Sequence, residues 1–391
     1  MSDPKAAPSR QRLDRLGAVL ATTCAAALAF LPFVVFKANR IVPGDPRGLL
    51  DVLPMPAALV TIVVVLCAGI TAVRVANAHV RLAAALLGVI VVSLAVAAAG
   101  DVLTPGGNKV VRVAPGAGFW LLLCSLGLMA TDAITRLRPG PIMRVVSLAL
   151  FIGVAALALA HGTFDHLSVM REYSVNAVRF AHEVRQHLWL ALGSLAAAGV
   201  VALPVGIFCH RVPRLRSGIL GALNLIQTIP AIALFGILMA PLGALAAAVP
   251  LAASLGIRGI GTAPAMIALF LYSLLPVVAN TVLGLKRVSP AAVEAARGMG
   301  MTSGQILTTV ELPLALPVII TGIRIVLVQN IGLVAIAALI GAGGLGSFIF
   351  QGIGQTAIDL VLLGAIPTVA LAFSAAVLLD ALVEAMDRAR P

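Results

Sequence analysis

Residues 82–103, LAAALLGVIVVSLAVAAAGDVL, decide the fold class of this protein, because Asp101 is the only charged side chain among them. A run of about 20 apolar residues is long enough to cross the hydrocarbon core of a bilayer as an α-helix. Across all 391 residues, 61% are hydrophobic and 11% are charged, whereas about 25% are charged in an average soluble domain. The chain is therefore an integral membrane protein, and a large aqueous catalytic domain is excluded.

Similar apolar runs recur along the chain and predict an all-α protein with about ten transmembrane helices. The first run follows a basic start and is too long for the apolar region of a signal peptide, so we expect it to be retained as a helix. The expected spans are residues 17–36, 55–73, 82–103, 117–134, 145–162, 188–209, 219–240, 263–283, 314–340 and 360–385.

The formal net charge of +12 is distributed in small groups between these runs. That distribution is typical of charges that set membrane topology and differs from the continuous basic groove of a nucleic-acid-binding protein. Lysine and arginine are more frequent in the loops that share a side with the chain ends. We therefore expect both termini in the cytoplasm of a multi-pass inner-membrane protein.

Three regions differ in character. Residues 1–163 form an N-terminal extension of about five helices, and residues 188–391 form a core of five more. Between them, residues 164–187 are polar with apolar positions near helical spacing, which favours a helix on the outer surface over a plain solvated linker. We also expect the histidines in and around this segment to be interfacial; they are His161, His166, His182 and His187.

The core contains one patterned loop, residues 284–313, whose capping residues predict a helical hairpin. Ser289 is suited to cap a helix that opens with Pro290, and Gly298 and Gly300 are suited to end it. Thr302 and Gln305 then form a capping-box pattern for a second short helix, which we expect to stop at Leu312 and Pro313. Helices this short need cover for their apolar faces, either from the protein's own helix ends or from a separate cytoplasmic protein.

The same loop resembles the "EAA" loop of permease subunits from binding-protein-dependent ABC importers, with Val310 where that family usually has isoleucine. The resemblance implies a core like that of MetI-type permeases and a hairpin that docks into a groove of a separate ATPase subunit. The residues that it implicates in this coupling are Glu294, Ala295, Ala296, Gly298, Gly300, Thr302, Gln305, Val310, Leu312 and Pro313.

Three further stretches, residues 227–230, 265–276 and 341–346, are similar to permeases for osmoprotectants such as glycine betaine or choline. The N-terminal extension resembles that of the longer, Yeh-type members. The resemblance implies two copies of an ABC ATPase, a second permease subunit that is identical or paralogous, and an extracytoplasmic solute-binding protein. It also implies alternating access driven by ATP and Mg²⁺ that bind to the partner ATPase.

The chain itself shows no catalytic, cofactor-binding or metal-binding pattern. A phosphate-binding loop needs a lysine that follows a glycine-rich turn, and none of the four lysines, Lys5, Lys37, Lys109 and Lys286, is so placed. Residues 341–346 formally match a dinucleotide-binding pattern, but they follow a membrane span instead of a β-strand. Gly343 and Gly344 are expected either in a bend for close helix packing or in a flexible outer gate.

Polar residues within the spans are candidates for the translocation pathway. Arg324 lies about 15 Å into its span at 1.5 Å per residue, so it needs a partner or water. Asp380 is the candidate for a structural ion pair, and a hydrated pathway is the alternative. The same alternatives, helix–helix hydrogen bonds or pathway, apply to Asn280, Gln329 and Asn330. Pro230, which interrupts its span, and Gln227 beside it are expected by the pathway.

A different class of function also fits ten spans: an ion-coupled secondary transporter with five-plus-five inverted repeats. Pro32 and Pro204 lie at similar depths of the first and sixth spans, as paired broken helices would. Such a transporter needs no docking hairpin, and the first half of the sequence has no counterpart of residues 289–313. A membrane scaffold that only recruits a cytoplasmic partner is the third reading. The few polar aromatic residues offer little for a cage around a quaternary ammonium, so we expect an external protein to select the solute.

Overall fold

The computed structural model describes residues 14–39, 42–104 and 110–388. These residues form two compact units, and residues 140–151 belong to the second unit although they precede part of the first. The first unit comprises residues up to 139 together with 152–171, and the second comprises 140–151 and 172 onward. The basic residues Lys5, Arg10, Arg12 and Arg390 near the chain ends, and Arg40 and Lys109 in loops, lie outside the described residues.

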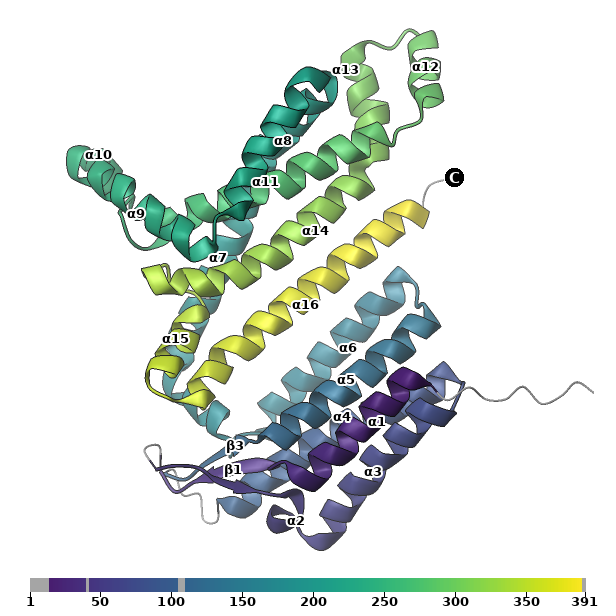
Figure 1. The fold of residues 1–391 in the computed structure, drawn as a ribbon, viewed down its shortest axis with the longest axis vertical. Coiled ribbons are helices and arrows are strands. Elements are labelled where there is room, and N and C mark those ends of the chain that lie inside the picture. The colour runs from purple at the N-terminus through teal and green to yellow at the C-terminus, as the bar shows by residue number, and fades with distance from the viewer. Residues whose placement is uncertain (1–13, 40–41, 105–109, 389–391) are drawn as a thin grey trace, which may run out of the picture. The chain divides into compact units, whose positions relative to one another are not determined.

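The first unit is a helical bundle with a small sheet at one end (Figure 1). Its helices are α1 (Arg15–Phe30), α2 (Leu49–Val52), α3 (Met55–Arg74), α4 (Ala78–Leu103), α5 (Ala117–Leu137) and the second half of α6 (Pro141–Ala160). The strands are β1 (Val34–Lys37), β2 (Asp45–Arg47) and β3 (Arg112–Pro115), in the order β2-β1-β3 and antiparallel. Hydropathy did not predict this sheet, because strands of three or four residues leave no periodic signal.

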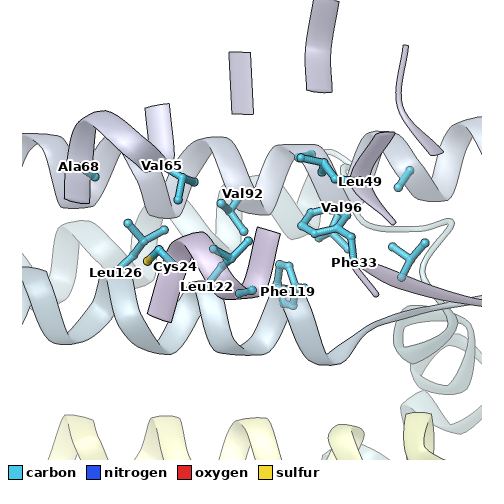
Figure 2. Packing of buried hydrophobic residues seen from close by; sticks show 14 of the residues in the cluster. Cys24, Phe33, Leu49, Val65, Ala68, Val92, Val96, Phe119, Leu122 and Leu126 are labelled. Atoms are coloured by element: carbon cyan, nitrogen blue, oxygen red, sulfur yellow. The ribbon is translucent and has the colours of Figure 1, made fainter. Parts of the chain in front are cut away.

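The core of the first unit lies between α1, α3, α4 and α5 (Figure 2). Cys24, Val65, Val92 and Leu122 meet there, each at most 1% exposed. Glycine permits the close approach of α1 to α3, because a Cβ on Gly17 would overlap the Ala72 carbonyl. These contacts explain why the membrane-embedded extension packs as a unit of its own.

The second unit contains the first half of α6 and, except for the first four residues of α7, which belong to the first unit, the remaining helices. They are α7 (Ser168–Arg211), α8 (Pro213–Thr228), α9 (Ala231–Ala248), α10 (Pro250–Ser254), α11 (Thr262–Lys286), α12 (Pro290–Gly298), α13 (Ser303–Ile306), α14 (Leu312–Ala337), α15 (Gly346–Gly354) and α16 (Ile358–Arg388). A π-helical turn, Leu307–Glu311, precedes α14, and a 3₁₀ turn, Ala338–Ile340, follows it. The long helices α11, α14 and α16 run side by side (Figure 1).

The predicted all-α membrane fold is confirmed. Among the described residues, nine helices are long and apolar enough to cross a bilayer, and α1, with 16 residues, is a shorter apolar helix. The span expected at 219–240 is instead divided between α8 and α9 at Ile229 and Pro230, since proline has no N–H to continue a helix. Residues 168–187 are the first part of the 44-residue α7 and not a separate helix.

Candidate functional site

The hairpin of residues 289–313 begins with α12. Ser289 is the N-cap residue, and Pro290 occupies the first turn, where a missing N–H costs nothing. At the other end, the Met299 N–H donates to the Ala295 carbonyl at 3.0 Å, and Gly300 adopts φ +81°. A Cβ at Gly300 would meet no atom within 4 Å. Glycine is therefore required there by the left-handed backbone and not by lack of space.

The second arm of the hairpin opens with the predicted capping box. The Thr302 N–H donates to Gln305 Oε1 at 2.8 Å, and the Gln305 N–H donates to Thr302 Oγ1 at 3.4 Å. The two bonds satisfy backbone N–H groups that the first turn of a helix leaves free. The start of α13 is thus determined by its own local sequence.

The second arm does not stop at Leu312 and Pro313, as we had expected. Helical structure continues from α13 through the π-helical turn into α14, with Pro313 in the first turn of α14. The Leu312 N–H donates to the Leu307 carbonyl, five residues back. This π-type hydrogen bond allows Pro313 to follow without interrupting the helical structure. Val310 is half-buried within this turn.

One face of the hairpin is covered by the chain and the other is not. Ala296 in α12 and Ile306 in α13 are buried, whereas Glu294, Ala295 and Met299 are exposed. Gly298, Gly300 and Thr302 are also exposed. An exposed methionine beside small residues and a carboxylate leaves room for another protein to approach closely.

An ion pair that sequence analysis missed anchors the root of the hairpin. Arg211, the last residue of α7, donates to Glu311 in the π-helical turn. The Glu311 side chain is only 5% exposed, against 43% for Arg211. A charged residue in each of two separate predicted loops offered no signal that they meet.

The glycine-rich segment 341–346 lies against the first half of α7. Glu183 accepts a hydrogen bond from the Gly344 N–H at 2.6 Å, and Gln186 donates to the Ala342 carbonyl at 3.1 Å. Gly343 and Gly344 have φ of +77° and +84°. A Cβ on Gly346 would overlap the Ala335 carbonyl. The segment is therefore a tight bend whose backbone is held by α7.

His187, which we expected to be interfacial, is part of the same contact and lies inside the protein. The imidazole is fully buried. Its Nδ1 accepts from the Leu345 N–H at 3.3 Å, and its Nε2 lies 3.0 Å from the Ile331 carbonyl. These two partners require a neutral ring with the proton on Nε2. Because residues 168–187 continue as α7, the histidine is carried into the protein interior.

Asn330 connects three helices in the interior of the second unit. Its Nδ2 donates to Ser194 Oγ on α7 and to Ser273 Oγ on α11, both at 2.9 Å. Each serine hydroxyl already donates to a backbone carbonyl of its own helix, to Leu190 or Leu269. Gln329, the neighbouring residue on α14, is half-buried. The geometry at Asn330 is that of a helix–helix hydrogen bond.

The break between α8 and α9 is fastened to α11. Gln227 Nε2 donates to the Tyr272 carbonyl at 2.8 Å, and the Tyr272 hydroxyl donates to the Ile229 carbonyl. Pro230 is the N-cap residue of α9. These bonds satisfy backbone groups at an interrupted helix, which an apolar environment requires. Asn280, also on α11, donates within its own helix to the Pro276 carbonyl at 2.8 Å.

Arg324 and Asp380 are paired, and the pair belongs to a larger ionic cluster. Arg324 Nη1 on α14 donates to Asp380 Oδ1 on α16. Arg144, which belongs to the second unit, contacts Asp380 at 2.8 Å and Glu384 at 3.0 Å. Arg388 contacts Glu384 at 2.6 Å. The sequence predicted the pair of Arg324 with Asp380 but gave no signal that Arg144 joins it.

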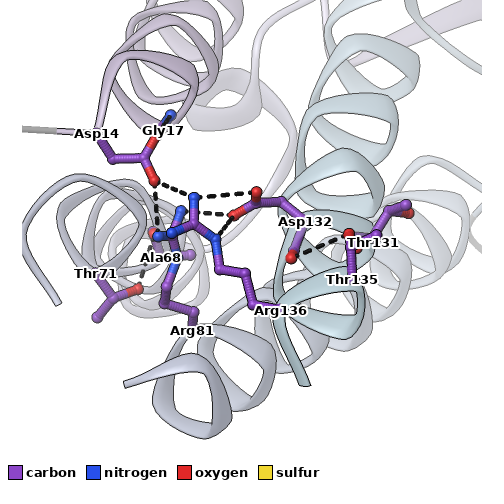
Figure 3. Close-up of polar contacts among 9 residues, drawn as sticks. All are labelled: Asp14, Gly17, Ala68, Thr71, Arg81, Thr131, Asp132, Thr135 and Arg136. Carbon is purple, nitrogen blue, oxygen red and sulfur yellow. Dashed lines mark hydrogen bonds and ion pairs between the residues drawn. The ribbon is translucent and has the colours of Figure 1, made fainter. Parts of the chain in front are cut away.

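The first unit has its own ionic cluster, at the end of the bundle where α1 begins (Figure 3). Arg81 on α4 contacts Asp14 and Asp132, both at 2.8 Å, and Arg136 on α5 contacts the same two carboxylates. Burial acts to raise the pKa of Asp14. Hydrogen bonds from Arg81 and the Gly17 N–H, with the charges of Arg81 and Arg136, outweigh it and lower that pKa to about 2. The four residues connect three helices.

Comparison with known proteins identifies both halves of the chain. Residues 14–170 match the family described as "ABC transporter permease YehY, N-terminal domain", and residues 202–390 match "Binding-protein-dependent transport system inner membrane component". The chain is 45% identical over 191 residues to the osmoprotectant import permease protein OsmW of Salmonella typhimurium, covering 49% of this chain and 84% of OsmW.

Two further relatives are each similar to about half of the chain. The carnitine transport permease protein OpuCD of Listeria monocytogenes is 39% identical over 208 residues, covering 53% of this chain and 86% of that protein. The glycine betaine/carnitine/choline transport system permease protein OpuCD of Bacillus subtilis is 38% identical over 201 residues, covering 51% and 81%. The chain therefore belongs to the family of inner membrane permease components of binding-protein-dependent ABC transport systems, and it carries the N-terminal domain of YehY-type permeases.

Proposed function

We propose that this protein is the membrane-spanning subunit of an importer for osmoprotectants, small compatible solutes such as glycine betaine or choline. The relatives named for osmoprotectant, carnitine, choline and glycine betaine transport support this substrate class. The solute crosses the inner membrane by alternating access. An extracytoplasmic binding protein delivers it, because the chain has only two Trp and two Tyr residues with which to build a cage for a quaternary ammonium.

The observation that carries the proposal is the continuity of the hairpin with α14. The exposed face with Glu294, Ala295 and Gly300 is joined through α13 and the π-helical turn to a helix that reaches Ala337. A force on the second arm is transmitted through continuous helical structure into α14. The hairpin thus docks to a separate ABC ATPase on the cytoplasmic side, and both chain ends lie on that side.

The rest of the assembly follows from the same arrangement. The chain has no phosphate-binding lysine loop, so ATP and Mg²⁺ bind to the partner ATPase. Two ATPase subunits engage two permease subunits, which are identical or paralogous and enclose the pathway between them. The bend at Gly343 and Gly344 closes the outer side, where Glu183 holds its backbone. The ion pair of Arg324 and Asp380 lies beside the pathway, within the membrane span.

Reconstitution tests this proposal. The permease, its ATPase and its binding protein are placed in vesicles, and ATP-dependent uptake of glycine betaine and choline is measured. Gly300→Glu is expected to leave the permease folded but to abolish uptake, because a bulky charged residue occupies the docking face.

Gly256→Glu is the matched control. Gly256 has φ +79°, close to that of Gly300, and a Cβ there also meets no atom within 4 Å, but it lies outside the hairpin. If Gly300→Glu and Gly256→Glu lower uptake equally, the docking role of the hairpin is excluded.

A further inference from the structure

A cavity of about 480 Å³ lies between α11, α14 and α16, at the root of the hairpin. Its polar lining includes Asn280, Thr321, Arg287 and Asp387, and its apolar lining includes Val318 and Val383. Sites for small molecules are typically cavities of about 300–1,000 Å³ with an apolar wall and a few polar groups. The described lining contains no aromatic side chain. The cavity therefore has the size of a solute site but no aromatic cage.

The Arg324–Asp380 pair lies one helical turn further into the protein than the cavity lining. Arg324 follows Thr321 by three residues on α14, and Asp380 precedes Val383 by three on α16, and residues at this spacing share a helix face. Within this chain, 32% of the Arg324 side chain and 44% of the Asp380 side chain remain exposed. Neither side chain is among the residues that line the cavity, but charged groups inside a membrane face water or a cavity, and the helix positions place the ion pair just beyond the inner end of the lining.

The charges around the cavity favour a ligand that carries a carboxylate. The ionic cluster around Asp380 contains three arginines and two acids, which are Arg144, Arg324, Arg388, Asp380 and Glu384. The cavity lining adds Arg287 and Asp387. One positive charge is left in excess. The guanidinium of Arg324 is suited to bind a carboxylate through two hydrogen bonds, and Asp380 beside it is suited to attract a cation.

We propose that this cavity is a binding site for a zwitterionic solute, with Arg324 as the residue that selects its carboxylate. The inference rests on the proposed function for the substrate class. The carboxylate replaces Asp380 on one edge of the guanidinium, while the ammonium group is attracted by the carboxylate of Asp380. Methyl groups on the ammonium pack against Val318 and Val383. Because Ser289 also lines the cavity, a bound solute contacts the root of the hairpin.

Equilibrium binding to the purified full-length permease tests the site without ATPase or binding protein. The two radiolabelled probes are glycine betaine and choline, which share a trimethylammonium group and differ in the carboxylate. Arg324→Gln is expected to weaken glycine betaine binding by about tenfold or more, because a charge-assisted hydrogen bond is lost. Choline binding is expected to be unchanged or tighter, since Asp380 loses its competing partner on α14.

Arg136→Gln is the control, because Arg136 is also an ion-paired arginine but belongs to the first unit. It is expected to change neither affinity. Equal losses of both ligands in Arg324→Gln would show a structural arginine and overturn the proposal. So would the absence of glycine betaine binding to the wild-type permease.

A second variant keeps the test decisive if Arg324→Gln does not fold. Val318→Phe fills the cavity and leaves the ion pair intact, so it is expected to abolish binding of both probes; retained binding would exclude this cavity. Uptake by the reconstituted importer separates the two proposals. Normal uptake of glycine betaine without binding at this cavity rejects the site alone, whereas no uptake of any osmoprotectant rejects the proposed function.

Discussion

Arg211 at the end of α7 and Glu311 in the π-helical turn are 100 residues apart in sequence and form an ion pair. Glu311 is buried and Arg211 is half-exposed. The pair connects the second arm of the hairpin to α7, the helix that also holds the glycine-rich bend through Glu183 and His187. A displacement of the hairpin therefore acts directly on the helix that contacts the bend.

The unequal burial of this pair predicts unequal costs of removing its members. Arg211→Leu leaves the buried Glu311 carboxylate without its cation and is expected to lower the free energy of unfolding by about 2 kcal/mol. Glu311→Leu leaves an arginine that water reaches, and the expected loss is less than about 1 kcal/mol. Denaturant unfolding of the purified variants measures both. Equal losses would show that the burial of Glu311 has no energetic consequence.

The ionic cluster of the first unit predicts a stability that depends on pH. The pKa of Asp14 is lowered from 3.8 to about 2 in the folded protein. Its stabilising contribution is therefore complete above pH 3.8 and is lost as the pH falls through 2. With allowance for screening by solvent, the loss is roughly 1–2 kcal/mol. Thermal unfolding between pH 5 and pH 2 measures this slope, and Asp14→Asn is expected to flatten it. An unchanged slope in that variant would refute the role of Asp14.

The hydrogen bonds around Asn330 predict which substitutions the site tolerates. Ser194 and Ser273 donate their hydroxyl hydrogens to backbone carbonyls, so neither is available to a carboxylate. Asn330→Asp buries a charge without a donor and is expected to cost several kcal/mol. Asn330→Leu removes polar atoms of which Oδ1 already has no hydrogen-bond partner, and it is expected to cost about 1 kcal/mol. Thermal unfolding of the two variants shows which substitution costs more stability. Gln329→Glu, on the same helix, is the control for added charge.

The close contact at Gly346 predicts a large effect from a single methyl group. In Gly346→Ala the new Cβ overlaps the Ala335 carbonyl, so α15 must move away from α14. We expect a loss of about 2 kcal/mol or more in the free energy of unfolding, together with reduced uptake. Gly354→Ala, at the other end of α15, meets no atom within 4 Å and is expected to be neutral. If Gly346→Ala has wild-type stability and uptake, the packing role of this glycine is excluded.

Local signals in the sequence were sufficient for most of the long helices and for the capping box of the hairpin. Apolar runs predicted the membrane spans because the bilayer requires a fixed length of apolar helix with every backbone hydrogen bond satisfied. Thr302 and Gln305 predicted their capping box because both partners lie within one helical turn. The end of the second arm was predicted wrongly, because the π-helical turn before Pro313 has no recognisable local signal.

Tertiary structure decided which distant charges meet. The sequence places Arg81, Arg144 and Arg211 near the ends of apolar runs. It does not show that each contacts a carboxylate from another helix. Burial of His187 likewise depended on α7 continuing past the polar segment. The spacing of apolar residues determines that a helix forms and crosses the membrane. The rotation of that helix, and hence the partner of each polar side chain, is determined only when neighbouring helices pack against it.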